Sequence, residues 1–177
     1  MTATTPFRKR SAGFTMLEVL VTIVIVSFGL LGIAGLQIFA LKNSQSAGFR
    51  SAASQQASNL IERIRANPVG ATAYDYNLPN TSFYTTAVAN CGAAAGCSAA
   101  DLAKNDAYQW TQQLAAALPS GAGVVCIDST PNDGTSASSS ACDNIGSLYA
   151  VKIWWLDDRS RANQSGTLER FSTAFRP

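Results

Sequence analysis

An uncharged apolar run from Val19 to Leu41 constrains this chain more than any other feature of its sequence. As an α-helix these residues would extend for about 34 Å, which suffices to cross the hydrocarbon core of a bilayer. A patch of basic residues at positions 8–10 comes just before the run. The positive-inside tendency therefore places residues 1–13 in the cytoplasm and the rest of the chain outside, although basic residues beyond the run weaken this bias.

The end of the apolar run offers a poor cleavage site. An ordinary secretory signal is cut after its apolar core, next to small residues. Here Ala40 is small, but Phe39 and Leu41 flank it. We therefore expect the apolar segment to stay on the mature protein.

Glu18 stands immediately before the uncharged run. A carboxylate near the start of a membrane span is costly, and such residues usually have a partner and a function. Glu18 could remain hydrated at the depth of the lipid headgroups, or it could await a positive charge from another subunit. The residue types alone leave both possibilities open.

The segment Gly13-Phe14-Thr15-Met16-Leu17-Glu18 resembles the processing motif of type IV pilins and pseudopilins. That motif has a basic leader, a Gly, a Phe that becomes the new N-terminus and a Glu five residues after the Gly. The resemblance implies a prepilin peptidase that cuts after Gly13 and N-methylates Phe14. It also implies that Glu18 pairs with the Phe14 amine of a neighbouring subunit. Methylation keeps the charge of the amine, and removing one partner of a buried ion pair costs about 3–5 kcal/mol.

The resemblance extends further along the chain. Residues 28–37, 41–47 and 61–68 are similar to the minor pilin family called PilV, whose members are often described as type IV pilus modification proteins. This implies a minor pilin that primes or enters the type IV pilus. The implied partners are prepilin peptidase, other minor pilins, the major pilin, the inner-membrane assembly machinery and a tip adhesin. The implied location is the bacterial inner membrane, with the C-terminal domain in the periplasm, and then the pilus near its tip.

Two alternative functions fit the same motif. A type II secretion pseudopilin has the same N-terminal pattern, although residues 43–46 and 63–68 favour the pilus family. A pilin specialised for adhesion or DNA uptake is the other alternative. The formal charge of +2 falls to near −1 without the three basic residues of the leader. Because nucleic-acid binders usually present a clustered basic face, we expect no nucleic-acid partner.

The sequence offers little for catalysis. The chain has no His, and the acids Asp128, Asp133 and Asp143 lie in a segment rich in Ser, Thr, Asn and Gly. Calcium takes several oxygen ligands, but no ordered spacing like that of an EF-hand loop is present. We therefore expect these acids to be solvated, and we expect neither an enzyme nor a bound metal or cofactor.

The four cysteines are Cys91, Cys97, Cys126 and Cys142. An even number in a periplasmic context predicts disulfides. Proximity favours Cys91–Cys97 and Cys126–Cys142, each closing a short loop, while crossed pairing stays open. Zinc binding is a rival hypothesis, but the spacings contain no C-x-x-C pair and there is no His to complete a mixed site. Free buried thiols are a further alternative.

A long first helix is predicted from about Thr15 to about Ala66, because the Pro after Asn67 disfavours helical conformation in the residue before it. Beyond Lys42 the pattern becomes amphipathic. The predicted domains are a leader at 1–13, a transmembrane or filament-core helix at 14–41 and a periplasmic pilin-like globular domain at 42–177, which includes the amphipathic half of the helix at 42–66.

Three glycines, Gly29, Gly32 and Gly35, lie inside the apolar run. Small residues at such spacing allow close approach of helices in membranes. Each also weakens a helix by about 0.8–1 kcal/mol relative to Ala in water. The glycines could therefore serve close packing, or they could form a soft segment that unwinds when the subunit enters a filament. We favour the soft segment.

The remainder predicts an α+β fold. A second helix is expected over 101–118, capped by Asp101 or Asn105, and strands are expected over 123–127, 147–156 and 168–175. Strands joined by turns rather than by crossover helices imply an antiparallel meander. In the middle strand Tyr149, Val151, Ile153 and Trp155 would share one face. That face would pack on the long helix in a pilin-like roll.

Several aromatic residues fit two interpretations. Tyr74, Tyr76, Phe83 and Tyr84 lie in a turn-rich stretch, where they could form a small satellite core or a contact patch for another subunit. We favour the satellite core, since long loops in compact domains must be tied down. Trp110 could belong to the core or to an interface.

Overall fold

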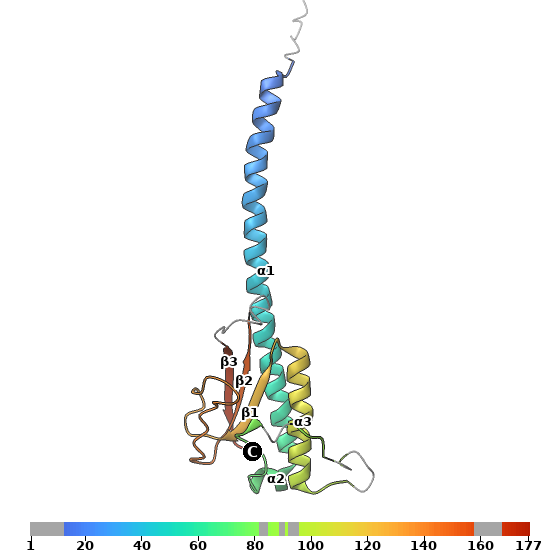
Figure 1. Cartoon of the computed structure of the whole chain (residues 1–177), viewed down its shortest axis with the longest axis vertical. Helices are drawn as coiled ribbons and strands as arrows, with labels where there is room; N and C mark the ends of the chain where they lie inside the picture. Colours follow the sequence, from blue (N-terminus) through green and yellow to red (C-terminus); the bar gives the residue numbers. More distant parts are fainter. Residues whose placement is uncertain (1–12, 82–84, 89–90, 92–95, 158–167) are drawn as a thin grey trace, which may run out of the picture. The chain divides into compact units, whose positions relative to one another are not determined.

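The computed structural model of the chain describes residues 13–81, 85–88, 91, 96–157 and 168–177. The described helices and strands are α1 (Met16–Ala66), α2 (Pro68–Thr72), α3 (Ala99–Ala117), β1 (Ala122–Ile127), β2 (Tyr149–Trp155) and β3 (Glu169–Phe175), which Figure 1 shows. Apart from Gly13, the predicted leader lies outside the described residues, as do Phe83 and Tyr84.

The chain divides into two compact units, Met1–Ser44 and Gln45–Pro177, and α1 contributes to both. In the first unit, α1 exposes its apolar side chains along its whole length. By length and composition, α1 is the helix in the described part of the chain that could cross a membrane.

The long helix α1 begins and ends within one residue of the predicted bounds. It stops at Ala66 because Asn67, which precedes Pro68, takes a non-helical backbone conformation with φ −117° and ψ 70°. The Asn67 side chain then accepts a hydrogen bond from the Gly70 amide at 3.1 Å and caps the short helix α2. The sequence did not predict α2, although Asn followed by Pro is a recognised helix start.

The second long helix, α3, has a different cap from the one predicted. Ser98 is its N-cap, and the Ser98 hydroxyl oxygen accepts a hydrogen bond from the Asp101 amide at 3.1 Å. The prediction that Asp101 or Asn105 would cap this helix was therefore wrong. Ser is among the best N-cap residues, and here it adds two residues to the start of the helix.

The three strands form one antiparallel sheet in the order β1-β2-β3, which confirms the predicted meander. In this register Val125 faces Val151, and Ile153 faces Phe171. Because directly paired residues share a face, the β2 residues Tyr149, Val151, Ile153 and Trp155 lie on one side with these partners, as predicted.

The core of the second unit lies between the helices and this sheet. The C-terminal part of α1 contributes Ala53, Ala57, Leu60 and Ile64 at helical spacing, all fully or almost fully buried. Trp110 of α3 is fully buried, and its indole N–H donates to the Gln56 carbonyl of α1 at 2.9 Å. Trp110 is thus a core residue that ties α3 to α1, which run side by side in Figure 1.

The long amphipathic helix packed on a small antiparallel sheet makes this an α+β fold, as predicted. Every residue of β2 is buried, so that both faces of this central strand are covered. The sequence predicted a cover for the helix-facing side alone. The second cover is the connection between β1 and β2, which contains buried Asp128, Ala137 and Ser140.

Candidate functional site

The junction between Gly13 and Phe14 lies in the open. Phe14 is 81% exposed, and a Cβ added at Gly13 would meet no atom within 4 Å. Nothing in the described part of the chain therefore requires glycine at position 13. An open junction whose small residue has no packing role is what an external peptidase would need, because extended, accessible backbone can enter an enzyme's cleft.

Thr15 comes immediately before α1 and accepts hydrogen bonds from its first turn. Its hydroxyl oxygen accepts a hydrogen bond from the Glu18 amide at 3.3 Å, and its carbonyl oxygen accepts from the same amide at 3.1 Å. Thr followed three residues later by Glu is the spacing of a capping box, a signal in the sequence that our predictions did not use. A carboxylate in the first turn also interacts favourably with the positive end of the helix dipole.

Glu18 is exposed and, within the described ranges, makes no ion pair. Capping explains why an acid is acceptable at the start of α1, but it leaves the charge of the carboxylate uncompensated. The predicted pairing of Glu18 with an amine of another subunit therefore remains a prediction.

The apolar surface of α1 from Val19 to Leu41 is exposed on every side of the helix. A Cβ added at Gly29, Gly32 or Gly35 would meet no atom within 4 Å. These glycines thus have no packing role within the described chain. Both predicted roles, close packing against another subunit and a soft segment, stay predictions.

A second cluster of charges lies inside the globular unit, around Lys152 of β2. This side chain is fully buried, and its ammonium group forms ion pairs with Asp128 and with Asp133, the latter at 2.5 Å from Nζ to Oδ1. It also donates to the Ser140 carbonyl at 2.8 Å. The prediction that these loop acids are solvated was wrong for Asp128, which is fully buried.

The remaining loop acids lie nearer the surface. The hydrogen bond from the Lys152 ammonium group and then that from the Thr130 hydroxyl hold the pKa of Asp133 below its ordinary value. The pKa of Asp143 is also lowered, chiefly by the hydrogen bond from the Ser129 hydroxyl. Folding therefore stabilises the ionised form of both carboxyl groups.

The connection from β1 to β2 is fastened over the sheet at several points. Arg170 of β3 donates to the carbonyl oxygens of Gly134, at 2.7 Å, and of Asn132. The Ser172 hydroxyl donates to the Asn132 side chain at 2.6 Å. Together with Lys152 these contacts hold the middle of the connection against β2 and β3. Sequence reasoning missed this arrangement because it depends on pairing between distant segments.

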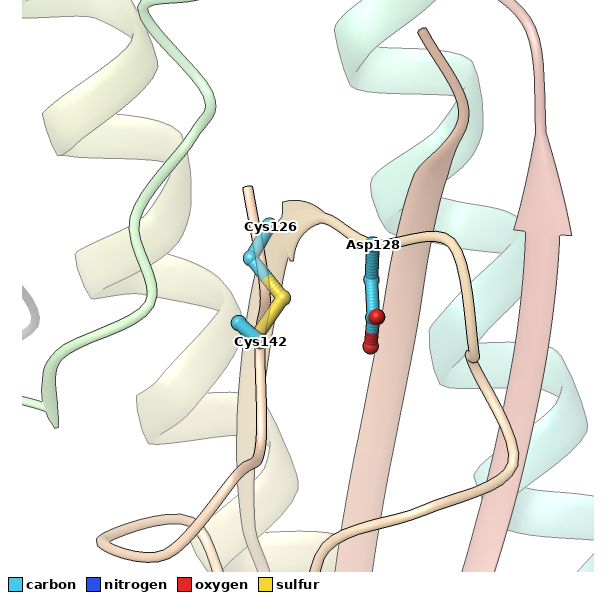
Figure 2. A group of neighbouring side chains, drawn as sticks. All are labelled: Cys126, Asp128 and Cys142. Carbon is cyan, nitrogen blue, oxygen red and sulfur yellow. A yellow bond between two sulfur atoms is a disulfide. The ribbon is translucent and has the colours of Figure 1, made fainter. Parts of the chain in front are cut away.

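The structure contains two disulfides, Cys91–Cys97 and Cys126–Cys142, which is the pairing that proximity in the sequence favours. Cys126, Asp128 and Cys142 place their ligand atoms within 4.8 Å of one another, as a metal site would. Figure 2 shows, however, that the two sulfur atoms are bonded to each other beside Asp128. They offer no thiolate, and Asp128 is paired with Lys152, so this group does not fit a metal ion.

A buried polar network links the turn between α1 and α2 to α3. The Tyr76 hydroxyl donates to Asp106 of α3 at 2.8 Å and accepts from the Asn67 amide group at 3.2 Å. Burial is the main cause that raises the pKa of Tyr76 well above its ordinary value. Tyr76 therefore belongs to the main core rather than to a satellite, whereas Tyr74 is half-exposed.

Comparison with known proteins gives two matches to family models. Residues 8–34 match the prokaryotic N-terminal methylation motif, and residues 35–108 match the family described as type IV pilin Tt1218. No curated protein and no solved structure matches the chain. The two family matches support a type IV pilin subunit, which is a structural protein rather than an enzyme. They also fit anchoring in the inner membrane followed by incorporation into a pilus.

Proposed function

We propose that the protein is a minor pilin of the type IV pilus, similar to PilV, which primes filament assembly or enters the filament near its tip. The observation that carries this proposal is the methylation motif at residues 8–34, whose Gly13–Phe14 junction is open and leads into an exposed apolar helix. A subunit with such a helix needs lipid around it before assembly and other subunits around it afterwards.

Processing is the first step of the proposed pathway. Prepilin peptidase cuts the bond after Gly13, and the new amine of Phe14 is methylated. The leader that leaves carries the basic patch at 8–10, while residues 14–41 stay in the membrane. Residues 42–177 lie in the periplasm, where two disulfides are expected to persist.

Extraction into the filament follows. The apolar surface of α1 moves from lipid to an environment of other apolar helices, which changes its burial little. The charge of Glu18 therefore decides whether the subunit is accepted in the filament. An unpaired carboxylate among apolar helices is strongly disfavoured, whereas a carboxylate paired with a neighbour's methylated Phe14 amine is not. The proposed partners are the major pilin, other minor pilins, the assembly machinery and a tip adhesin.

A deletion experiment distinguishes the proposed pilus function from the alternative of a type II secretion pseudopilin. We expect a strain that lacks this protein to lose most of its surface pili, seen by electron microscopy, and to export proteins normally. Expression of the wild-type chain in that strain should restore the pili. Normal piliation together with failed protein secretion would contradict the pilus assignment and support the pseudopilin.

A further inference from the structure

We propose that Lys152 and Asp128 become joined by an intramolecular amide bond after the globular unit has folded. Both side chains are fully buried, and the Lys152 ammonium group contacts Asp128 Oδ2 directly. Asp128 follows the end of β1, and Lys152 lies in the middle of β2, the strand that pairs with β1. This inference does not depend on the proposed pilus function.

The other contacts of Lys152 suit an attacking amine. A neutral amine has two N–H bonds and one lone pair. The acceptors Asp133 Oδ1 at 2.5 Å and the Ser140 carbonyl at 2.8 Å can take the two N–H bonds, and the Asp133 carbonyl lies farther away at 3.4 Å. The contact toward Asp128 is then left for the lone pair. Two reacting groups that the fold already holds in contact do not pay the entropic cost of meeting.

The surroundings of Asp128 suit the carbonyl group that is attacked. The Thr130 amide donates to Asp128 Oδ1 at 3.0 Å, and this is the oxygen that would carry negative charge in the tetrahedral intermediate. The Cys126–Cys142 disulfide lies beside the carboxyl group and forms an apolar wall (Figure 2). Because both reacting side chains are fully buried, bulk water has little access to the product, which disfavours its hydrolysis.

The reaction balances without any further reagent. A proton moves from Lys152 Nζ to Asp128 Oδ2, which gives a neutral amine and a neutral carboxylic acid. The Nζ lone pair then bonds to Cγ, and Asp133 takes a second proton from Nζ and passes it to Oδ2. The bond from Cγ to Oδ2 breaks, and one water molecule leaves. Asp133 is suited to this transfer because its carboxyl group is partly exposed and contacts Nζ.

The test is the mass of the full-length protein, purified from membranes and reduced, compared with the mass that its observed N-terminus requires. We expect the protein to be one water lighter, and we expect a digest to contain a branched peptide that joins the segments around 128 and 152. A wild-type protein of full mass, with these two segments in separate peptides, would overturn the proposal.

Variants test which residues form the linkage and which residue transfers the proton. Lys152→Arg keeps the charge but should show no loss of water, and a loss that persists in it would overturn the assignment. Asp133→Asn should lower the rate of linkage by about 10²-fold or more, as expected for the loss of a proton-transfer group. Asp101→Asn is the control, because this half-exposed acid pairs with Lys104 and not with Lys152, and it should link fully. Equal linkage in Asp133→Asn and wild type would overturn the role of Asp133.

Discussion

Glu18 and Lys152 are two charged side chains whose charges are balanced in different ways. Lys152 is fully buried and finds its carboxylate partners within its own fold. Glu18 is exposed at the first turn of α1 and has no ion pair among the residues described. The charge that would balance Glu18 must therefore come from outside the described chain, and in the proposed function it comes from a neighbouring subunit.

The substitution Glu18→Gln tests that pairing. It preserves the size of the side chain and removes its charge, so cleavage after Gly13 should proceed while incorporation into pili falls by about 10²-fold, the consequence of losing a buried ion pair. Immunoblots of sheared pili and of membranes measure both effects. Glu62→Gln is the control, because Glu62 is an exposed acid of the same helix, paired with Arg65 at 2.9 Å. Normal incorporation of Glu18→Gln would contradict the pairing.

The substitution Lys152→Met should lower the free energy of unfolding by about 3–5 kcal/mol, because it leaves the carboxyl group of Asp128 buried without the Lys152 nitrogen, which otherwise pairs with it or, in the linked protein, holds it in the amide bond. Denaturant unfolding of the protein in detergent measures this difference. Lys104→Met is the matched control, because Lys104 is half-exposed and lies 3.8 Å from its partner Asp101. Its effect should stay within about 0.5 kcal/mol. Equal stability of both variants would show that the buried cluster does not stabilise the fold.

Acid should weaken the fold through the loop carboxyl groups. The pKa of Asp133 is lowered by the hydrogen bonds from Lys152 Nζ and from the Thr130 hydroxyl, and that of Asp143 is lowered chiefly by the Ser129 hydroxyl. A lowered pKa in the folded state gives stability that is present above the unfolded value, about 3.9, and is lost as the pH falls through the folded value. Unfolding at pH 6 and pH 3 should show this loss, and Asp133→Asn should reduce it. An unchanged pH dependence in Asp133→Asn would contradict the contribution of Asp133.

At the scale of elements, the approach of α3 to β1 depends on Gly123. A Cβ at this position would lie 2.5 Å from Trp110 Cη2 and 2.9 Å from Leu114 Cδ1. Both neighbours are fully buried, and they have little freedom to move. The absence of a side chain at Gly123 thus sets how closely the helix can pack on the sheet.

Gly123→Ala should therefore destabilise the protein by about 1–3 kcal/mol, the usual effect of overpacking. Gly48→Ala is the opposite case, because Gly48 lies inside α1 with no atom within 4 Å of an added Cβ. It should stabilise the protein by about 0.5–1 kcal/mol. Thermal unfolding of the two variants checks both signs, and a neutral Gly123→Ala would show that α3 and β1 can separate without loss.

The elements that could be predicted from the sequence are those with strong local signals. The bounds of α1 follow from a long apolar run and from Pro68, and the strands follow from apolar runs between turns. The cap Ser98 was missed because several polar residues stand near the start of α3, and local propensity does not separate them. The pairing of Lys152 with Asp128 and Asp133 was missed for a different reason. This pairing exists because the connection after β1 folds back over the sheet. A contact between segments so far apart in the sequence cannot be predicted from a local pattern.

At the scale of the whole molecule, the two units of the chain have different characters. The first unit carries an exposed apolar helix, and the second carries a closed core with two disulfides and a fastened loop. The processing motif was predictable because its residues are contiguous, and the family match at residues 8–34 supports it. Its use in a particular filament was not predictable in the same way, because the partners lie outside the chain.

The most direct measurement is the N-terminal sequence and intact mass of the protein recovered from bacterial membranes. The proposed function predicts a chain that begins at Phe14 with a methylated amine. A Gly13→Leu variant should keep its leader, while Gly48→Ala, which changes an exposed glycine far from the junction, should be processed normally. A wild-type chain that still begins at residue 1 or 2, or one that begins after about residue 40, as cleavage after an apolar signal would leave it, would contradict pilin processing and the filament function with it.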